Sequence, residues 1–319
     1  MPWDAAWSAA LYGPHGFYRR PEGPAGHFRT AGHAGGQVLA GALLRLAAEH
    51  GATAIVDVGA GRGELLTALA HPTPDGPSLP RLHGVDVVDR PGALPASVSW
   101  SCGLDATDEA VFEGALVVAW EVLDVIACPV LQCTDGALRV VLVEADGTER
   151  LGEPAGRAEQ EWCRRWWPVG EGERAESGTT RDAWWAGLVT RASTAGAVAL
   201  LAVDYAHHRA DRPPGGSLVG YRAGRLVPPI PDGSCDLTAH VALDAVAAAG
   251  ERAGARTVEL TDQRTALRRL GVRGRLREGE PWSASALARV ATEAELIDAG
   301  GLGGFGWLVQ RPGSGYGVT

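Results

Sequence analysis

The stretch Ile55-Val56-Asp57-Val58-Gly59-Ala60-Gly61-Arg62-Gly63-Glu64-Leu65-Leu66 decides the fold of this chain. Its first residues are apolar and mostly β-branched, which predicts a buried parallel strand. Gly59, Gly61 and Gly63 predict a tight turn, because glycine lacks a Cβ and lets the backbone take positive φ and approach a ligand closely. The residues from Glu64 onward have helical character. The stretch therefore predicts a strand, a glycine-rich turn and a helix whose N–H groups point toward a ligand.

The spacing of these glycines distinguishes among nucleotide-type ligands. The dinucleotide fingerprint has a third glycine where Glu64 stands, and a Walker-type loop needs a lysine, which the whole chain lacks. Asp57 is a poor neighbour for a phosphate and a good partner for an ammonium group. S-adenosylmethionine carries an ammonium group, a sulfonium and a ribose but no phosphate, so Asp57, Gly59, Gly61 and Gly63 match the first motif of class I methyltransferases. An ordinary tight turn of an α/β protein is the alternative interpretation.

Two further carboxylates follow at positions suited to the rest of this cofactor. Residues 81–89 predict a second strand, and Asp86 lies 23 residues beyond Gly63 (86 − 63). An acid about 20 residues on, at the end of this strand, captures ribose hydroxyls. We favour Asp86 over the competing Asp89. Asp105 follows a short predicted strand and is the candidate for the adenine amino group.

The candidate catalytic residues follow two more predicted strands. Residues 115–120 end in Glu121 and Asp124, and residues 197–203 end in Asp204-Tyr205. Ligands of open parallel sheets bind outside the carboxyl ends of the strands. Glu121 and Asp124 would share one face if the chain turned helical there. The alternative is a pair of surface acids at a helix start, favoured by the helix dipole.

His240 lies in a segment, residues 236–241, that we expect to open a helix with Asp236 or Thr238 as its N-cap. Tyr205 and His240 are candidates to orient the substrate or accept a proton. A histidine satisfied by the backbone at a helix start is the alternative for His240.

Composition limits the classes of function. The chain has 319 residues, 45% of them hydrophobic, and a net charge of −9, which disfavours nucleic acid as a partner. A run of arginines within residues 264–277 is interpreted as a solvated helix face and loop. Five scattered cysteines favour a reducing compartment, and no cluster of metal ligands is visible. With neither a signal sequence nor a membrane-spanning stretch, we expect a soluble cytoplasmic protein that does not bind a membrane.

The order of predicted elements gives an α/β fold, with a mostly parallel sheet and helices on both faces. We divide it into residues 1–52, an N-terminal arm and first helix, and residues 53–319, a class I methyltransferase domain with an insertion at about 129–195. Residues 8–32 look irregular and aromatic, and either form a lid or strap down the N-terminus. The insertion combines a β-hairpin with tryptophan-rich helices, which we interpret as a subdomain core rather than a substrate cage.

Several motifs together resemble the MidA-like family of methyltransferases, which includes the mitochondrial complex I assembly-factor arginine methyltransferase. The resemblance implies a Rossmann-like fold with an inserted helical lobe, S-adenosylmethionine as cofactor, with Thr30 among its ligands, and methylation of a protein arginine. The motifs cover roughly residues 8–250 in the family's order: Tyr12-Gly13-Pro14-x-Gly16-Phe17-Tyr18, Gly26-x-Phe28-x-Thr30, Val56 to Leu65, Glu121-x-x-Asp124 with Pro129-Val130, Asp204-Tyr205, and Asp236-Leu237-Thr238-Ala239-His240-Val241.

The chain departs from the family pattern at three places. The family has an acid where His27 stands, the sequence Ser-Pro-Glu where this chain has Ala31-Gly32-His33, and an asparagine where Trp120 stands. These positions bear on the substrate, so they leave its identity open.

The mechanism we expect is direct in-line methyl transfer, in which alignment and exclusion of water supply most of the acceleration. Glu121 and Asp124 would clamp a guanidinium bidentately. The partner is then a protein substrate, or a small-molecule methyl acceptor for an O- or N-methyltransferase on the same scaffold. A non-catalytic cofactor-binding assembly protein also remains open, as does oligomerisation.

Overall fold

The fold is described from a computed structural model, which covers residues 1–20, 31–71 and 80–313 and, for residues 31–34, the backbone alone. The chain forms two compact units. Unit 1 comprises Met1–Phe28, Val122–Gly187 and Tyr205–Ala249, and unit 2 comprises Arg29–Glu121, Leu188–Asp204 and Gly250–Thr319. The domain division predicted at residue 52, with an insertion at about 129–195, stays a prediction.

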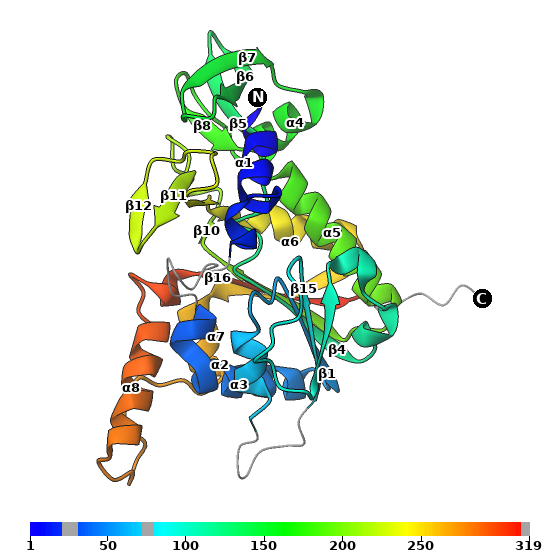
Figure 1. The fold of residues 1–319 in the computed structure, drawn as a ribbon, viewed down its shortest axis with the longest axis vertical. Coiled ribbons are helices and arrows are strands. Elements are labelled where there is room, and N and C mark those ends of the chain that lie inside the picture. The colour runs from blue at the N-terminus through cyan, green and yellow to red at the C-terminus, as the bar shows by residue number, and fades with distance from the viewer. Residues whose placement is uncertain (21–30, 72–79, 314–319) are drawn as a thin grey trace, which may run out of the picture. The chain divides into compact units, whose positions relative to one another are not determined.

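Unit 2 is built on a seven-stranded sheet with the order β15-β16-β9-β4-β1-β2-β3 (Figure 1). All neighbouring pairs are parallel except those of β16, which runs antiparallel to both β9 and β15. The predicted α/β fold with a mostly parallel sheet is thus confirmed. The strands are β1 (Ala54–Val58), β2 (Arg81–Asp86), β3 (Val98–Cys102), β4 (Ala115–Trp120), β9 (Ala199–Asp204), β15 (Ala255–Asp262) and β16 (Gly306–Pro312).

The central strands are buried on both faces. Every residue of β1, β4 and β9 is buried, as the uninterrupted apolar runs predict. The chain order reverses at β1, which pairs with β2 on one side and β4 on the other. Such a switch point places a ligand crevice at the carboxyl ends of these strands.

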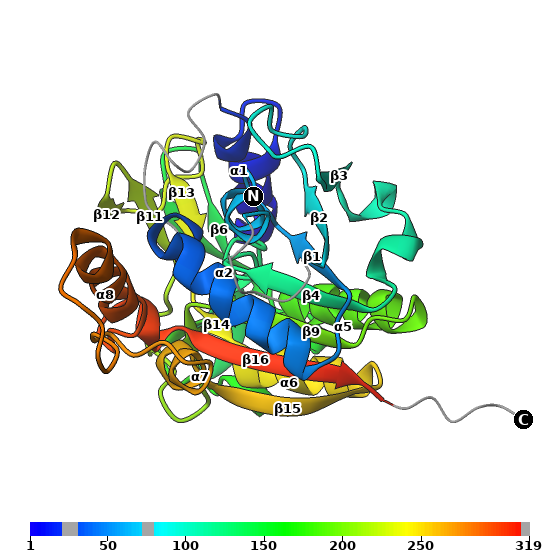
Figure 2. The same cartoon turned by 90° about the horizontal axis from the view of Figure 1, so that it is seen from below.

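Four helices cover one face of this sheet and share its hydrophobic core. Leu116, Val118 and Trp120 alternate along β4 and all pack into that core. Figure 2 shows α2 lying across this face. The helices are α2 (Ala31–Glu49), α3 (Glu64–Leu69), α7 (Gln263–Arg269) and α8 (Ala284–Leu296), with the short turns η3 (Leu104–Ala106), η4 (Glu109–Phe112) and η5 (Leu302–Gly304) in the same unit.

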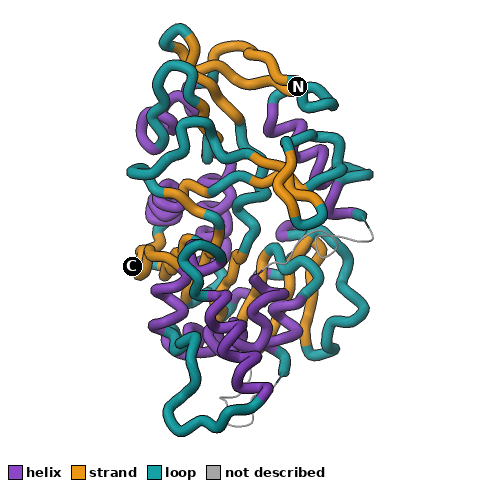
Figure 3. The backbone as a smooth tube through the Cα atoms, turned by 90° about the vertical axis from the view of Figure 1, so that its left-hand side faces the viewer, coloured by secondary structure: helices purple, strands orange, loops and turns teal. Residues whose placement is uncertain are grey.

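Unit 1 contains three small sheets, with the orders β7-β6-β5-β8, β12-β11-β13 and β10-β14. Figure 3 shows the short strands of this unit and the loops and turns between them. Its elements are α1 (Trp3–Tyr12), η1 (Phe17–Arg19), β5 (Val130–Thr134), β6 (Ala137–Val143), β7 (Glu149–Pro154), α4 (Arg157–Trp166), β8 (Arg174–Glu176), β10 (Ala206–His207), β11 (Val219–Arg222), β12 (Arg225–Val227), β13 (Asp236–Thr238) and β14 (Val241–Ala242). Two helices include residues of both units, α5 (Thr179–Thr194) and α6 (Leu243–Arg252).

The predicted hairpin and tryptophan core of this region are confirmed. Asp135 and Gly136 both have positive φ and join β5 to β6. Trp162 and Trp167 lie in a buried cluster with β5 and α6 residues, and Trp185 is fully buried. The tryptophans therefore stabilise unit 1 from inside.

Two local predictions were wrong. Residues 236–241 do not open a helix: they form β13 and the start of β14, because the backbone from Asp236 to Thr238 pairs with β11, and α6 begins only at Leu243. Residues 8–12 are helical, as part of α1. The condition under which Glu121 and Asp124 would share a helix face is not met, because the chain forms bends and a turn there.

Among the described residues, no helix is both long and apolar enough to span a membrane.

Candidate active site

The glycine-rich turn follows β1 as predicted. Gly59, Gly61 and Gly63 have φ of +79°, +58° and +79°, a region that residues with a Cβ rarely adopt. A Cβ on Gly63 would lie 2.5 Å from the Cδ1 of Leu94. The turn therefore needs glycine for its backbone shape and, at Gly63, for space as well.

Asp86 ends β2 and holds this turn. Its Oδ2 accepts a hydrogen bond from the Gly61 N–H (2.7 Å), and its Oδ1 accepts one from the Val88 N–H (3.2 Å). Burial raises the pKa of Asp86, while these backbone hydrogen bonds oppose the rise. The competing candidate, Asp89, lies exposed in the following loop. Asp86 is thus the acid tied to the glycine turn.

Asp57 is a buried carboxylate in the same unit, 3% exposed, just before the turn. Burial, followed by the charges of Asp86 and Glu64, raises the pKa of Asp57 to about 7. All three influences disfavour its ionised form. A ligand with an ammonium group would reverse this balance, and a ribose would offer hydroxyls to Asp86. The site therefore fits S-adenosylmethionine.

The other predicted cofactor ligands have no described hydrogen bond to the glycine-rich turn. Asp105 lies exposed in η3, after β3. This segment is linked to the turn indirectly, because the Gly103 N–H donates to the backbone carbonyl of Asp86 (2.7 Å). Thr30 and His27 lie outside the described residues.

Glu121 follows β4 with an unusual backbone. Its φ is +52°, one of three positive values among the described non-glycine residues, and its N–H donates to the carbonyl of Val203 in β9 (2.8 Å). The preceding residue, Trp120, packs edge to face on Trp307, with ring centroids 5.6 Å apart. Trp120, where the family has asparagine, is therefore a core residue of unit 2.

Asp124 is a buried residue of unit 1. Its Oδ2 accepts a hydrogen bond from the Thr238 hydroxyl (2.7 Å), and its backbone carbonyl accepts one from Arg181 Nη2 (2.7 Å). Burial raises the pKa of Asp124, opposed by the Thr238 hydrogen bond and the Arg181 charge. Without a helix here, Asp124 and Glu121 do not share a helix face.

Tyr205 and His240 come together in unit 1. Their rings stack with centroids 5.9 Å apart, and both side chains are partly exposed to solvent. The Val241 N–H donates to the Tyr205 carbonyl (2.7 Å), which fixes the two segments in register beside the β10–β14 pair. Burial lowers the pKa of His240, although the charges of Glu176 and Asp124 oppose the shift. Its imidazole is therefore neutral at pH 7.

The sequence interpretation missed three residues that organise this part of unit 1. Arg181, 2% exposed, donates to the backbone carbonyls of Asp124, Ile126 and His240. Tyr18 donates from its hydroxyl to Asp236 Oδ2 (3.3 Å). Tyr18 and Asp236 both lie within motifs of the family resemblance, and this was the sequence signal that could have identified them. Arg181 lies in none of these motifs.

The sequence matches a known protein family. A family model described as "Putative S-adenosyl-L-methionine-dependent methyltransferase" (Methyltransf_28) matches residues 81–261. No curated protein matches the chain.

Two solved structures of COG1565 superfamily proteins from Burkholderia thailandensis share the fold. One, bound to S-adenosyl-homocysteine, is 25% identical with a TM-score of 0.78, and the alignment covers 98% of this chain and 87% of that one. The other, a native structure, is 24% identical with a TM-score of 0.77 and the same coverage.

These findings confirm the predicted resemblance and the predicted cofactor, S-adenosylmethionine. The chain belongs to the Methyltransf_28 family of S-adenosyl-L-methionine-dependent methyltransferases.

Proposed function

We propose that this methyltransferase acts on a protein arginine side chain. The observation that carries the proposal is the backbone of Glu121, whose φ of +52° puts a residue with a carboxylate where glycine would be relaxed. Such a conformation costs about 1–3 kcal/mol and persists mostly at functional sites. A carboxylate at the end of β4 supports a guanidinium substrate, because it accepts two parallel N–H bonds. The family resemblance supports the same substrate.

The residues around the glycine turn are proposed to hold the cofactor. Asp57 would bind its ammonium group, Asp86 its ribose hydroxyls and Asp105 its adenine amino group, with Thr30 as a further ligand. Gly59, Gly61 and Gly63 would admit it close to the backbone. When bound, S-adenosylmethionine supplies a methyl group already activated on a sulfonium.

The remaining candidates are proposed to act on the acceptor. Glu121 would bind the guanidinium and orient one nitrogen, and Asp124 is the second candidate for this role. Tyr205, partly exposed, would pack on the substrate's apolar stem. The reacting nitrogen must lose a proton, and the neutral imidazole of His240 would accept it at a ring nitrogen.

Binding of the cofactor is tested first, by calorimetric titration with S-adenosylmethionine, S-adenosylhomocysteine and NAD. We expect micromolar binding of the first two and none of NAD. Asp86→Ala should weaken binding at least roughly tenfold, by about 1.4 kcal/mol, whereas the matched exposed-loop control Asp89→Ala should leave it unchanged. Equal effects of both variants would remove Asp86 from the ribose role.

Substrate class is tested by transfer of a radiolabelled methyl group from the cofactor to protein and metabolite fractions of a cell extract. Label recovered as methylarginine supports the proposal, and Glu121→Gln should abolish it while cofactor binding persists. Glu144→Gln, an exposed acid in unit 1, is the matched control. Label confined to small molecules would indicate the O- or N-methyltransferase instead. Cofactor binding without any turnover would indicate a non-catalytic assembly protein.

The cytoplasm is the proposed location. All five cysteines are unpaired in the structure, which supports a reducing compartment.

A further inference from the structure

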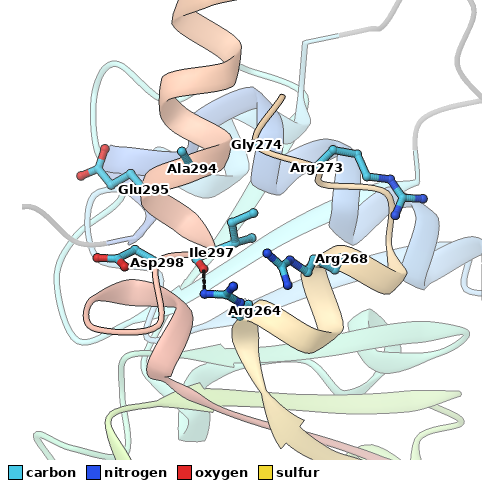
Figure 4. A pocket seen from close by; sticks show the side chains of 8 residues that line it. All are labelled: Arg264, Arg268, Arg273, Gly274, Ala294, Glu295, Ile297 and Asp298. Carbon is cyan, nitrogen blue, oxygen red and sulfur yellow. Dashed lines mark hydrogen bonds between the residues drawn. The ribbon is translucent and has the colours of Figure 1, made fainter. Parts of the chain in front are cut away.

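Unit 2 carries a pocket of about 530 Å³ whose lining includes none of the candidate cofactor or catalytic residues (Figure 4). It lies between α7 and the last turn of α8, away from the glycine turn in sequence. Its lining is Arg264, Arg268, Arg273, Gly274, Ala294, Glu295, Ile297 and Asp298.

Three arginines line this pocket. Arg264 and Arg268 are one helical turn apart on α7, where two like charges destabilise a helix by roughly 0.2–0.5 kcal/mol. The guanidinium of Arg264 has a partner, because it donates a hydrogen bond to the Ile297 carbonyl (3.2 Å). Within the described ranges, no hydrogen bond or ion pair is seen for the side chains of Arg268 and Arg273. Two guanidinium groups are therefore available to a ligand, in a chain whose net charge is −9.

The opposite side of the pocket is acidic. Figure 4 shows Glu295 and Asp298 on the other side of the pocket from Arg273, with their carboxylates pointing away from the arginines. A ligand must therefore be negative at the α7 side and neutral or positive at the α8 side. A nucleic acid, with a continuous row of phosphates, fits this poorly. A polypeptide can place an acidic and a basic side chain at the two ends.

Apolar surface continues from the pocket along α8. Leu287, 46% exposed, is seven residues before Ala294 and so lies on the same helix face. Trp282, just before α8, is 79% exposed. Exposed apolar groups next to a charged pocket are typical of protein interaction sites. The 13-residue helix α8 is about 20 Å long, which about six extended residues would span.

We propose that this surface docks an extended segment of a partner polypeptide. Its acidic side chains would pair with Arg268 and Arg273, a basic side chain with Asp298, and an apolar side chain would cover Leu287. Because all these residues lie outside the candidate active site, the proposal does not depend on the methyl acceptor.

The test is fluorescence anisotropy with a labelled peptide of about ten residues, carrying two leucines, then a lysine, then three glutamates. The pocket variant is Arg268→Gln with Arg273→Gln. The matched control is Arg275→Gln with Arg277→Gln, which removes the same charge from exposed arginines of the same loop that do not line the pocket. Thermal melts verify that both variants fold.

We expect the pocket variant to lose at least roughly tenfold in affinity, by about 1.4 kcal/mol, and the control to change less than about twofold. A second peptide with glutamine in place of glutamate should bind as weakly to the wild type as the first peptide binds to the pocket variant. Equal losses in both variants would overturn the proposal, because they would show a general charge effect. Absence of binding to the wild type, or tighter binding of a single-stranded DNA oligonucleotide than of the peptide, would overturn it too.

Discussion

The ring of Tyr205 stacks on the imidazole of His240, with centroids 5.9 Å apart and planes inclined by 23°. Stacking removes water from one face of the imidazole, and desolvation is the largest cause of the lowered pKa of His240. Tyr205→Ala should therefore move the pKa of His240 back toward its ordinary value, and Tyr205→Phe should not. An NMR titration of the imidazole measures this without a substrate. A pKa that is the same in all three proteins would show that the stack does not tune His240.

A second prediction concerns Asp57. Its pKa of about 7 in the folded protein exceeds its ordinary value of 3.8, so the folded state binds more protons between these two pH values. The stability associated with this proton is fully present below about pH 4 and is lost as pH rises through 7. A shift of about three pKa units corresponds to roughly 4 kcal/mol at most. Asp57→Asn should therefore flatten the pH dependence of the free energy of unfolding over this window, measured by denaturant titration.

The same group links cofactor binding to pH. The ammonium group of S-adenosylmethionine favours ionised Asp57, so we expect affinity to rise from pH 5 to pH 8, with a proton released on binding. Calorimetry in buffers of different ionisation enthalpy measures that proton. If Asp57→Asn releases the same proton, Asp57 is not its source.

The sheet and its glycine turn could be predicted because local rules determine them. Continuous apolar runs form buried strands, and glycine at alternate positions after β1 allows the positive φ that the turn requires. Asp86 could be preferred over Asp89 because its place at the strand end follows from strand geometry alone.

Where the predictions were wrong, contacts between residues far apart in sequence determine the local structure. Asp236 and Thr238 resemble N-cap residues, but their side chains bind Tyr18 and Asp124 instead, and their backbone pairs with β11. Similarly, nothing local to Glu121 signals its positive φ. The role of Arg181 depends on three carbonyls 55 to 59 residues away in sequence, which no local pattern can reveal.

A third prediction follows from the strain at Glu121. Glycine adopts φ near +52° without a steric cost, so Glu121→Gly should raise the free energy of unfolding by about 1 kcal/mol. Methyl transfer should nevertheless be lost. Glu121→Ala removes the same carboxylate but keeps the strain, so it should lose activity without this gain. Equal stabilities of the glycine and alanine variants, measured by urea denaturation, would argue against a strained site.

A fourth prediction concerns Arg181, whose guanidinium donates to the carbonyls of Asp124 (2.7 Å), Ile126 (3.0 Å) and His240 (2.9 Å). The rigid fork of arginine reaches three acceptors at once, which a lysine ammonium on a flexible stem does not reproduce. Buried carbonyls left without a donor cost about 1–3 kcal/mol each. Arg181→Lys should therefore lower the free energy of unfolding by about 2–4 kcal/mol. It should also loosen the segments that carry Asp124 and His240, which would be seen as faster amide hydrogen exchange in those segments.

Arg157→Lys, on the exposed face of α4, is the control and should change neither the free energy of unfolding nor the exchange rates. A stability loss without faster exchange at Asp124 and His240 would mean that Arg181 supports the fold of unit 1 generally rather than these two segments.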